Sequence, residues 1–230
     1  MKRIVLFATL MGILVQGGCG IVALTTTPTQ YEKKVAAEIN LIKQEGVKVL
    51  VLVKEPAWLG ARANLRYYMT EQINKSLVKQ VKIDPDNIIR YQKLADFRAK
   101  QENFAGLWPE ELGRAFDSDY VLIVRIDSFV LTEIDETGLY KGSLNAQAVL
   151  VDVETGKKVW PDIEDSKVIR VGYDVEKGDR AQAITRLAAA AAHCTTRYFY
   201  DCPKDKFRIA EDMSHISYEK WGETWDIGRF

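Results

Sequence analysis

Apolar residues at four-residue intervals predict the main amphipathic helix of this chain. Leu65, Met69, Ile73 and Leu77 recur along one face of residues 61–80, as they do in a helix that packs on a sheet. A second long helix is predicted over 179–198, where apolar residues follow at spacings of three and four in an alanine-rich segment. Periodicity and helix-end signals predict further short helices over 31–45, 94–101 and 110–116.

Runs of β-branched residues predict the strands. Residues 47–53 are almost continuously apolar, which is typical of a strand covered on both faces, and we expect this strand to be central. A short strand is expected at 88–91, and three β-prone runs follow at 120–131, 139–153 and 157–171. Turns that contain Gly138 and Gly156 join the three runs at hairpin length, so an antiparallel three-strand meander is predicted. The expected fold class is α/β (α+β), a mixed sheet with helices packed on it.

The first 18 residues indicate a signal peptide. A basic start is followed by an apolar stretch over 4–15 and by Gly17 and Gly18 immediately before Cys19. Such a stretch falls well short of the roughly 30 Å hydrocarbon core, so a retained transmembrane helix is the weaker interpretation.

The residues around Cys19 resemble the lipobox of bacterial lipoproteins, in which the cysteine is acylated and becomes the mature N-terminus. The sequence departs from that pattern at Gln16 and Gly17, and Val15 lies one position too early. The resemblance implies stable membrane anchoring through lipid on Cys19; the alternative is an ordinary cleaved signal in which Cys19 has no special role. Residues 19–30 then form a linker. In the enterobacterial sorting rule an Asp after the lipidated Cys retains a lipoprotein in the inner membrane. Gly20 occupies that position here, which weakly favours the outer membrane, facing the periplasm.

The length of the chain fits one domain, and its balanced charge disfavours a nucleic-acid partner. The chain has 230 residues, with 32 basic and 32 acidic side chains mixed along nearly every segment, whereas nucleic-acid binders carry a basic excess or stripe. We expect a single α/β domain over 31–205 and an arm or tail over 206–230.

The cysteines predict one disulfide. With Cys19 assigned to lipid, Cys194 and Cys202 remain as a pair in an oxidising compartment. On one continuous helix their Cα atoms would lie roughly 12 Å apart, beyond the ~7 Å that a bridge allows. The helix must therefore end between them, and Pro203 favours that ending.

Motifs for catalysis, cofactors and metals are not found in the sequence. His193 and His215 occur outside any metal-binding spacing, and His193 is expected to be a packed or surface residue. The aspartates at 84, 86, 117 and 119 lack the ligand order of an EF-hand and are expected to lie in turns. Tryptophans remain as candidates for binding: Trp58, Trp108 and Trp160, which core packing could equally explain, and the pair Trp221 and Trp225, which we expect to form a partner-binding patch.

Two segments resemble a group of envelope proteins. Residues 112–126, with Asp119-Tyr120-Val121-Leu122 between a helix and a strand, and residues 149–160, with Thr155-Gly156 in a hairpin that ends at Trp160, resemble the penicillin-binding-protein-activator lipoproteins. The curli-secretion channel lipoprotein and the N-terminal domain of TolB share this layout. The resemblance implies the architecture over 47–200 and no particular activity.

These observations predict a lipid-anchored accessory protein of the cell envelope that binds another envelope protein and carries out no catalysis. Two alternatives stay open: a subunit of a homo-oligomeric secretion or assembly ring, and an envelope hydrolase. A pore is disfavoured because the hairpin loops are too short to hold membrane-spanning strands.

Overall fold

The computed structural model describes residues 33–44 and 46–209. Its main sheet contains five strands in a mixed arrangement: β2 (Val49–Lys54), β3 (Tyr120–Ile134), β4 (Leu139–Asp152), β5 (Lys158–Trp160) and β6 (Lys167–Lys177). β2 runs parallel to β3, and β4 is antiparallel to β3, β5 and β6. The predicted fold class and the antiparallel meander are therefore confirmed.

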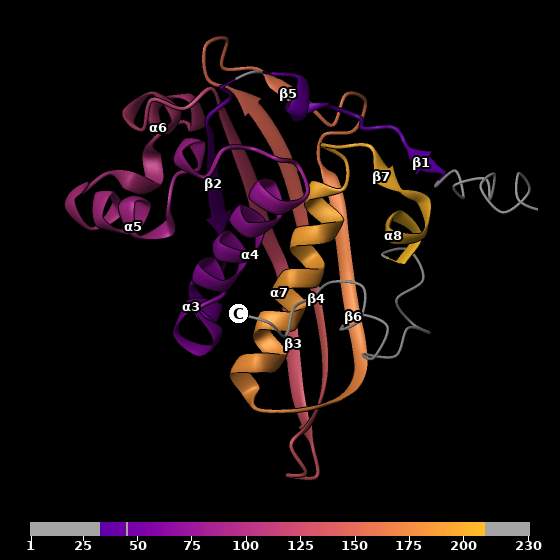
Figure 1. The fold of residues 1–230 in the computed structure, drawn as a ribbon. Coiled ribbons are helices and arrows are strands. Elements are labelled where there is room, and N and C mark those ends of the chain that lie inside the picture. Colours follow the sequence, from indigo (N-terminus) through magenta and orange to yellow (C-terminus); the bar gives the residue numbers. More distant parts are fainter. Residues whose placement is uncertain (1–32, 45, 210–230) are drawn as a thin grey trace, which may run out of the picture. The chain divides into compact units, whose positions relative to one another are not determined.

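Helices cover the two faces of this sheet unequally (Figure 1). α4 (Leu65–Lys79) and α7 (Arg180–Thr196) lie side by side over one face. α5 (Tyr91–Lys100) and α6 (Pro109–Ala115) pack on the other face, against β2 and β3. The other α-helices among the described residues are α3 (Ala57–Ala63) and α8 (Lys204–Ile209), so the arm predicted from residue 206 begins inside α8.

The apolar run of β2 has a core on each side. Alternate residues Val49, Val51 and Val53 join the core beneath α4 and α7, because successive side chains of a strand point to opposite faces. Leu50 and Leu52 join a second core with Leu94 and Leu112, from α5 and α6. The prediction of a strand buried on both faces is confirmed.

The position of β2 in the sheet corrects the sequence analysis. β2 pairs along its length with β3 alone, so it is an edge strand and not the central one. Its outer edge meets a single bridge from Val49 to Ile88, with the Ile89 amide donating to the Val49 carbonyl at 3.2 Å. The strand predicted at 88–91 is reduced to this bridge, because helix α5 already begins at Tyr91.

Other boundaries changed where tertiary contacts outweigh local propensity. The predicted helix over 31–45 is replaced by β1 (Lys34–Val35) and a 3-10 turn, Leu41–Lys43. β1 pairs with β7 (Cys202–Pro203), and the Glu38 amide donates to the Tyr198 carbonyl at 2.9 Å, so the end of α7 sets the path of this segment.

Two predicted elements are each divided. The helix expected over 61–80 breaks at Asn64, whose φ of 45° lies in the left-handed region that asparagine tolerates. Leu65, Met69, Ile73 and Leu77 are nevertheless all buried, as the periodicity predicted. The strand expected over 157–171 becomes β5 and β6, which pair with successive parts of β4 on the same side.

The predicted disulfide is not present. Cys194 and Cys202 are both buried thiols, and both belong to the core beneath α4 and α7. α7 ends between them at Thr196, as expected, but the chain then leads Cys202 into β7, where it pairs with Val35. Each sulfur packs as a small apolar group, and the Cys202 thiol contacts the Tyr200 hydroxyl at 3.4 Å.

Candidate functional site

Several residues proposed from the sequence lie outside the described residues: Cys19, His215, Trp221 and Trp225. His193, which is described, is a packed residue of α7 with 1% of its surface exposed. Its Nε2 lies 3.0 Å from the carbonyl oxygen of Lys206. Burial lowers the pKa of His193 to about 3, so its imidazole is neutral at physiological pH.

Three of the four aspartates considered as calcium ligands, Asp84, Asp117 and Asp119, accept hydrogen bonds from the protein. Asp84 accepts from the Asp86 amide at 2.9 Å, and Asp119 accepts from the Lys48 amide at 2.7 Å. Asp117 pairs with the Lys48 ammonium at 2.8 Å, and this hydrogen bond lowers the pKa of Asp117. Asp84 thus holds its own turn, as expected, whereas Asp117 and Asp119 join the turn before β3 to the segment before β2.

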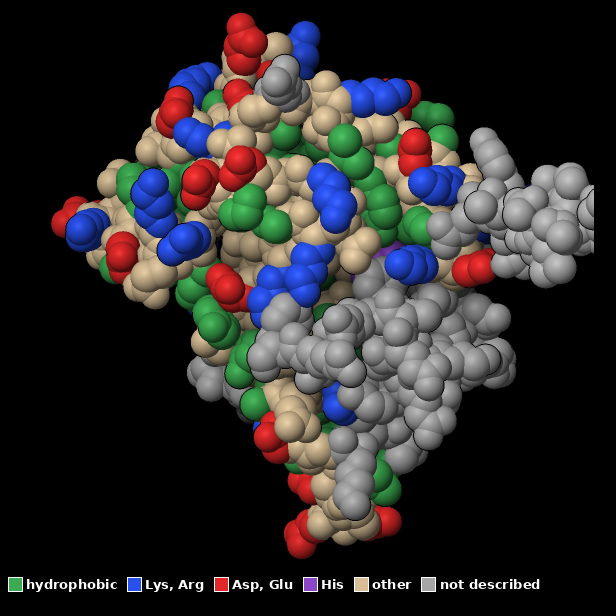
Figure 2. Space-filling model, viewed as in Figure 1, with side chains coloured by type: hydrophobic (Ala, Val, Ile, Leu, Met, Phe, Trp, Pro, Cys, Tyr) green, Lys and Arg blue, Asp and Glu red, His purple; other side chains and the backbone are tan. Residues whose placement is uncertain are grey.

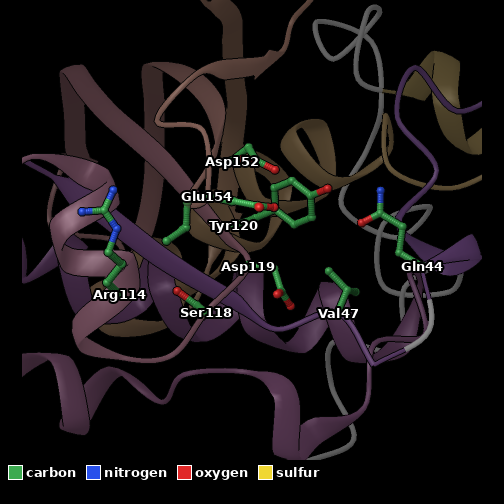
Figure 3. A pocket seen from close by; sticks show the side chains of 9 residues that line it. Gln44, Val47, Arg114, Ser118, Asp119, Tyr120, Asp152 and Glu154 are labelled. Carbon is green, nitrogen blue, oxygen red and sulfur yellow. The ribbon is translucent and has the colours of Figure 1, made fainter.

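A first cavity, of about 430 Å³, lies where β2 and β3 begin and β4 ends. Figure 3 shows the acidic side chains of Asp119, Asp152 and Glu154 around Tyr120, with Gln44 on one side and Arg114 on the other. Asp152 also accepts from the amide and hydroxyl of Thr155, at 2.8 and 2.7 Å. Asp152 thus holds the turn at Thr155 and Asp119 holds the backbone of Lys48, so two of the three acids already accept backbone hydrogen bonds.

Metal binding finds no support within residues 33–44 and 46–209. No group of three or more His, Cys, Asp or Glu side chains in this part of the chain is placed to hold a metal ion. Basic and acidic side chains are interspersed over the face shown in Figure 2, so no basic stripe crosses it.

The described tryptophans differ sharply in burial. Trp160 is 1% exposed and belongs to the core, whereas Trp58 is 57% and Trp108 is 67% exposed. Trp108 stands immediately before α6, and its amide donates to Oε2 of Glu111 at 2.8 Å, so a rigid helix start presents the exposed indole. The sequence did not distinguish these three tryptophans as candidates for partner binding. Their exposure now selects Trp58 and Trp108.

A second cavity, of about 470 Å³, lies at the carboxyl end of β2 and was missed by the sequence analysis. Ligands of open α/β sheets bind in crevices at this end of the strands. We call it the arginine cavity; its charged lining residues are Lys54, Glu55, Arg66, Arg98 and Glu102. Its apolar lining residues are Leu52, Val53, Phe104, Ala105, Leu107 and Leu112.

Glu55 and Arg66 form an ion pair in the arginine cavity. Nε of Arg66 donates to Oε1 of Glu55 at 2.5 Å, and the Arg66 amide donates to Oε2 at 3.2 Å. The side chain of Glu55 is only 2% exposed and that of Arg66 is 37% exposed. Both oxygens of this buried carboxylate are thus used by one residue, as burial of a charge requires.

Arg98 is the second arginine of the cavity. Its guanidinium carbon lies 4.5 Å from the centre of the Phe104 ring. Burial, and then the positive charge of Arg66, lower the pKa of Arg98, although an arginine stays charged at neutral pH. Among the described residues no carboxylate forms an ion pair with Arg98. Arginines on helices are common and give no periodic signal, which explains why the sequence did not single out this pair.

Comparisons with known proteins show similarity of fold only. No model of a known family matches the chain, and no curated protein is similar to it in sequence. Similar solved structures include the lipoprotein GNA1162 from Neisseria meningitidis, with 17% identity over 63% of this chain and 94% of that chain and a TM-score of 0.40.

Two further structures are similar at the same level. A PelC dodecamer from Paraburkholderia phytofirmans has 14% identity over 69% of this chain and 91% of that chain, with a TM-score of 0.41. A protein from Caulobacter crescentus described as a lipoprotein has 14% identity over 62% of this chain and 81% of that chain, with a TM-score of 0.30. These TM-scores are too low to carry an argument about function, so the proposals below depend on the residues of this chain.

Proposed function

We propose that this chain is a lipid-anchored accessory protein of the bacterial cell envelope whose α/β domain binds another envelope protein. The anchor follows from the leader and Cys19 alone. No helix in the described part of the chain has both the length and the apolarity to cross a membrane.

Exposure of Trp58 and Trp108 is the observation that carries the binding proposal. More than half of each side chain is accessible to solvent, and exposed tryptophans are enriched at the energetic centres of protein interfaces. Trp108 directly follows Leu107, and Trp58 lies three residues after Glu55; both neighbours line the arginine cavity. The two indoles are therefore tied by short stretches of chain to one region of the surface.

Crosslinking in living cells tests partner binding. A photo-crosslinking aromatic amino acid placed at position 58 or 108 is expected to give one discrete product with a second envelope protein. Thr132, an exposed residue of β3, is the control position. It lies seven residues along β3 from Arg125, the partner of Lys54 at the carboxyl end of β2, about 23 Å away at ~3.3 Å per residue. Equal products from position 132, or none from 58 and 108, would refute this interface.

The same experiment separates the alternatives. Crosslinks only between copies of this chain, in large assemblies, would favour the homo-oligomeric ring, whereas a monomer without crosslinks would return attention to an enzyme. Trp221→Ala with Trp225→Ala tests the tail, which stays a prediction because these residues lie outside the described ones. Unchanged partner capture by this double variant would remove the tail from the proposed interface.

The anchor has its own test. Cys19→Ala is expected to abolish incorporation of a labelled fatty acid and to release the protein from the membrane fraction. Continued labelling of the Cys19→Ala protein would contradict lipidation at this residue. Separation of inner and outer membranes then tests the outer-membrane, periplasm-facing location that Gly20 favours.

A further inference from the structure

We propose that the arginine cavity binds a small organic anion, with a carboxylate or phosphate group held by Arg66 and Arg98 and a compact apolar group against Leu107 and Leu112. This proposal goes beyond partner binding and does not depend on it. The volume of the cavity is in the range that small ligands fill.

Charge balance in the cavity is the first argument. Three basic residues, Lys54, Arg66 and Arg98, face two acidic ones, Glu55 and Glu102, which leaves one positive charge in excess. Glu55 is the buried acid, and both of its oxygens accept hydrogen bonds from Arg66. No carboxylate among the described residues forms an ion pair with Arg98, and Glu55 attracts it only as a neighbouring charge while it pairs with Arg66.

Orientation of Arg98 is the second argument. The guanidinium carbon of Arg98 lies over the Phe104 ring, and an arginine that contacts a ring can still donate from the N–H groups of its planar fork. Phe104 is itself supported by Phe97, at 6.3 Å between ring centres, and Phe97 by Phe116, at 5.1 Å. The donors of Arg98 are thus held by a chain of aromatic contacts before any ligand arrives, which lowers the entropic cost of binding.

Repulsion between the two arginines is the third argument. The positive charge of Arg66 helps to lower the pKa of Arg98, so the two guanidiniums repel each other, although the negative charge of Glu55 acts in the opposite direction. An oxyanion bound by both side chains would attract both guanidiniums and so offset this repulsion. Arginine is suited to this role because its planar fork forms two parallel hydrogen bonds with a carboxylate or phosphate.

The rest of the lining indicates that the anion is attached to an apolar group. Leu107 and Leu112 belong to the wall of the cavity, and a leucine side chain contributes contact energy only to an apolar ligand group. Ligand sites generally combine such walls with a small number of charged groups that fix orientation. Inorganic phosphate alone would leave this wall without a contact.

Titration calorimetry of the full-length protein in detergent, at constant ionic strength, tests the proposal with four probes. Benzoate and phenyl phosphate present an oxyanion on a compact ring, benzamide presents the same ring without charge, and inorganic phosphate presents charge without the ring. We expect benzoate or phenyl phosphate to bind more tightly than the other two, and the tighter of them identifies the preferred anionic group. The proposal would be overturned if benzamide or inorganic phosphate bound as tightly as the preferred anionic probe, or if no probe bound at all.

Variants of Arg98 localise the site. Arg98→Gln is expected to raise the Kd of the preferred probe by about tenfold or more, the loss expected for a charge-assisted bidentate contact. Lys93→Gln is the matched control, because it makes the same charge change on an exposed residue of the same helix that does not line the cavity.

Arg98→Lys is the second variant, in case Arg98→Gln does not fold. It keeps the charge but cannot form two parallel hydrogen bonds, so we expect a smaller but measurable loss of affinity. Unchanged Kd in a folded Arg98→Gln protein, or equal losses in Arg98→Gln and Lys93→Gln, would show that the anion does not bind at this arginine. Loss of crosslinks at positions 58 and 108 would not affect this result, so the two proposals fail separately.

Discussion

Nε1 of Trp160 donates a hydrogen bond of 2.7 Å to Oε2 of Glu38, across 122 residues of sequence. The other carboxylate oxygen of Glu38 accepts from the Lys167 ammonium at 2.9 Å. Trp160 also packs against Phe199, with 4.9 Å between the ring centres. One buried indole therefore connects the segment before β2, the strand β5 and the chain that follows α7.

Loss of the Trp160 hydrogen bond is expected to destabilise the domain. Trp160→Phe removes the N–H donor and some buried volume, so we expect the free energy of unfolding to fall by about 1–3 kcal/mol in urea denaturation. Trp108→Phe is the control, because Trp108 is 67% exposed and its replacement is expected to cost under about 0.5 kcal/mol. Similar losses in the two variants would show that burial does not distinguish them.

Gly113 allows α6 to approach the sheet closely. A Cβ atom at this position would lie 2.2 Å from Cγ2 of Val153 and 3.1 Å from Cγ2 of Val121. Although alanine generally favours helices over glycine, we expect Gly113→Ala to lower the free energy of unfolding by about 1–3 kcal/mol through overpacking. Gly172→Ala is the control, because its Cβ would meet nothing nearer than the Gly142 carbonyl oxygen at 3.5 Å. A stabilised Gly113→Ala protein would contradict the close packing.

The buried thiols can be tested by alkylation. Burial raises the pKa of Cys194 to about 12, so its sulfur is a protonated, unreactive thiol at neutral pH. In a Cys19→Ser protein, we expect iodoacetamide to label neither Cys194 nor Cys202 in the native state and to label both in denaturant without reductant. Intact mass spectrometry gives the count. If the two cysteines are labelled in denaturant only after reduction, the predicted disulfide between Cys194 and Cys202 is present after all.

The imidazole of His193 makes stability depend on pH. Its pKa is about 3 in the folded protein because of burial and about 6.5 in an unfolded chain. Between these values the unfolded state binds the extra proton, so the free energy of unfolding falls as the pH decreases below 6.5.

The magnitude expected from His193 is about 2 kcal/mol at pH 5 relative to pH 8, since each pKa unit corresponds to about 1.4 kcal/mol. Urea denaturation at the two pH values measures it. His193→Gln removes the titration and keeps a donor near the Lys206 carbonyl, so its stability is expected to change less over this range. The same pH dependence in wild type and His193→Gln would assign the effect to other groups.

Local pattern determined the identity of the main elements. The four-residue spacing from Leu65 to Leu77 predicted the buried face of α4, because a helix repeats every 3.6 residues wherever it packs. The continuous apolar run of β2 and the glycine turns at Gly138 and Gly156 predicted a strand and a meander for equally local reasons. The predictions of a signal peptide and of lipid on Cys19 likewise depend on short segments, and only the sequence supports them.

Only the tertiary structure decided how distant segments meet. Four features depend on partners far along the chain, which no local period encodes. They are the edge position of β2, the extended path of Glu38, the burial of Trp160 and the exposure of Trp108. The thiols of Cys194 and Cys202 show the same limit, because spacing permits a bridge but the direction of the chain after α7 decides it. Arg66 and Arg98 belong to different helices and share one cavity only because α4 and α5 both pack at the end of β2.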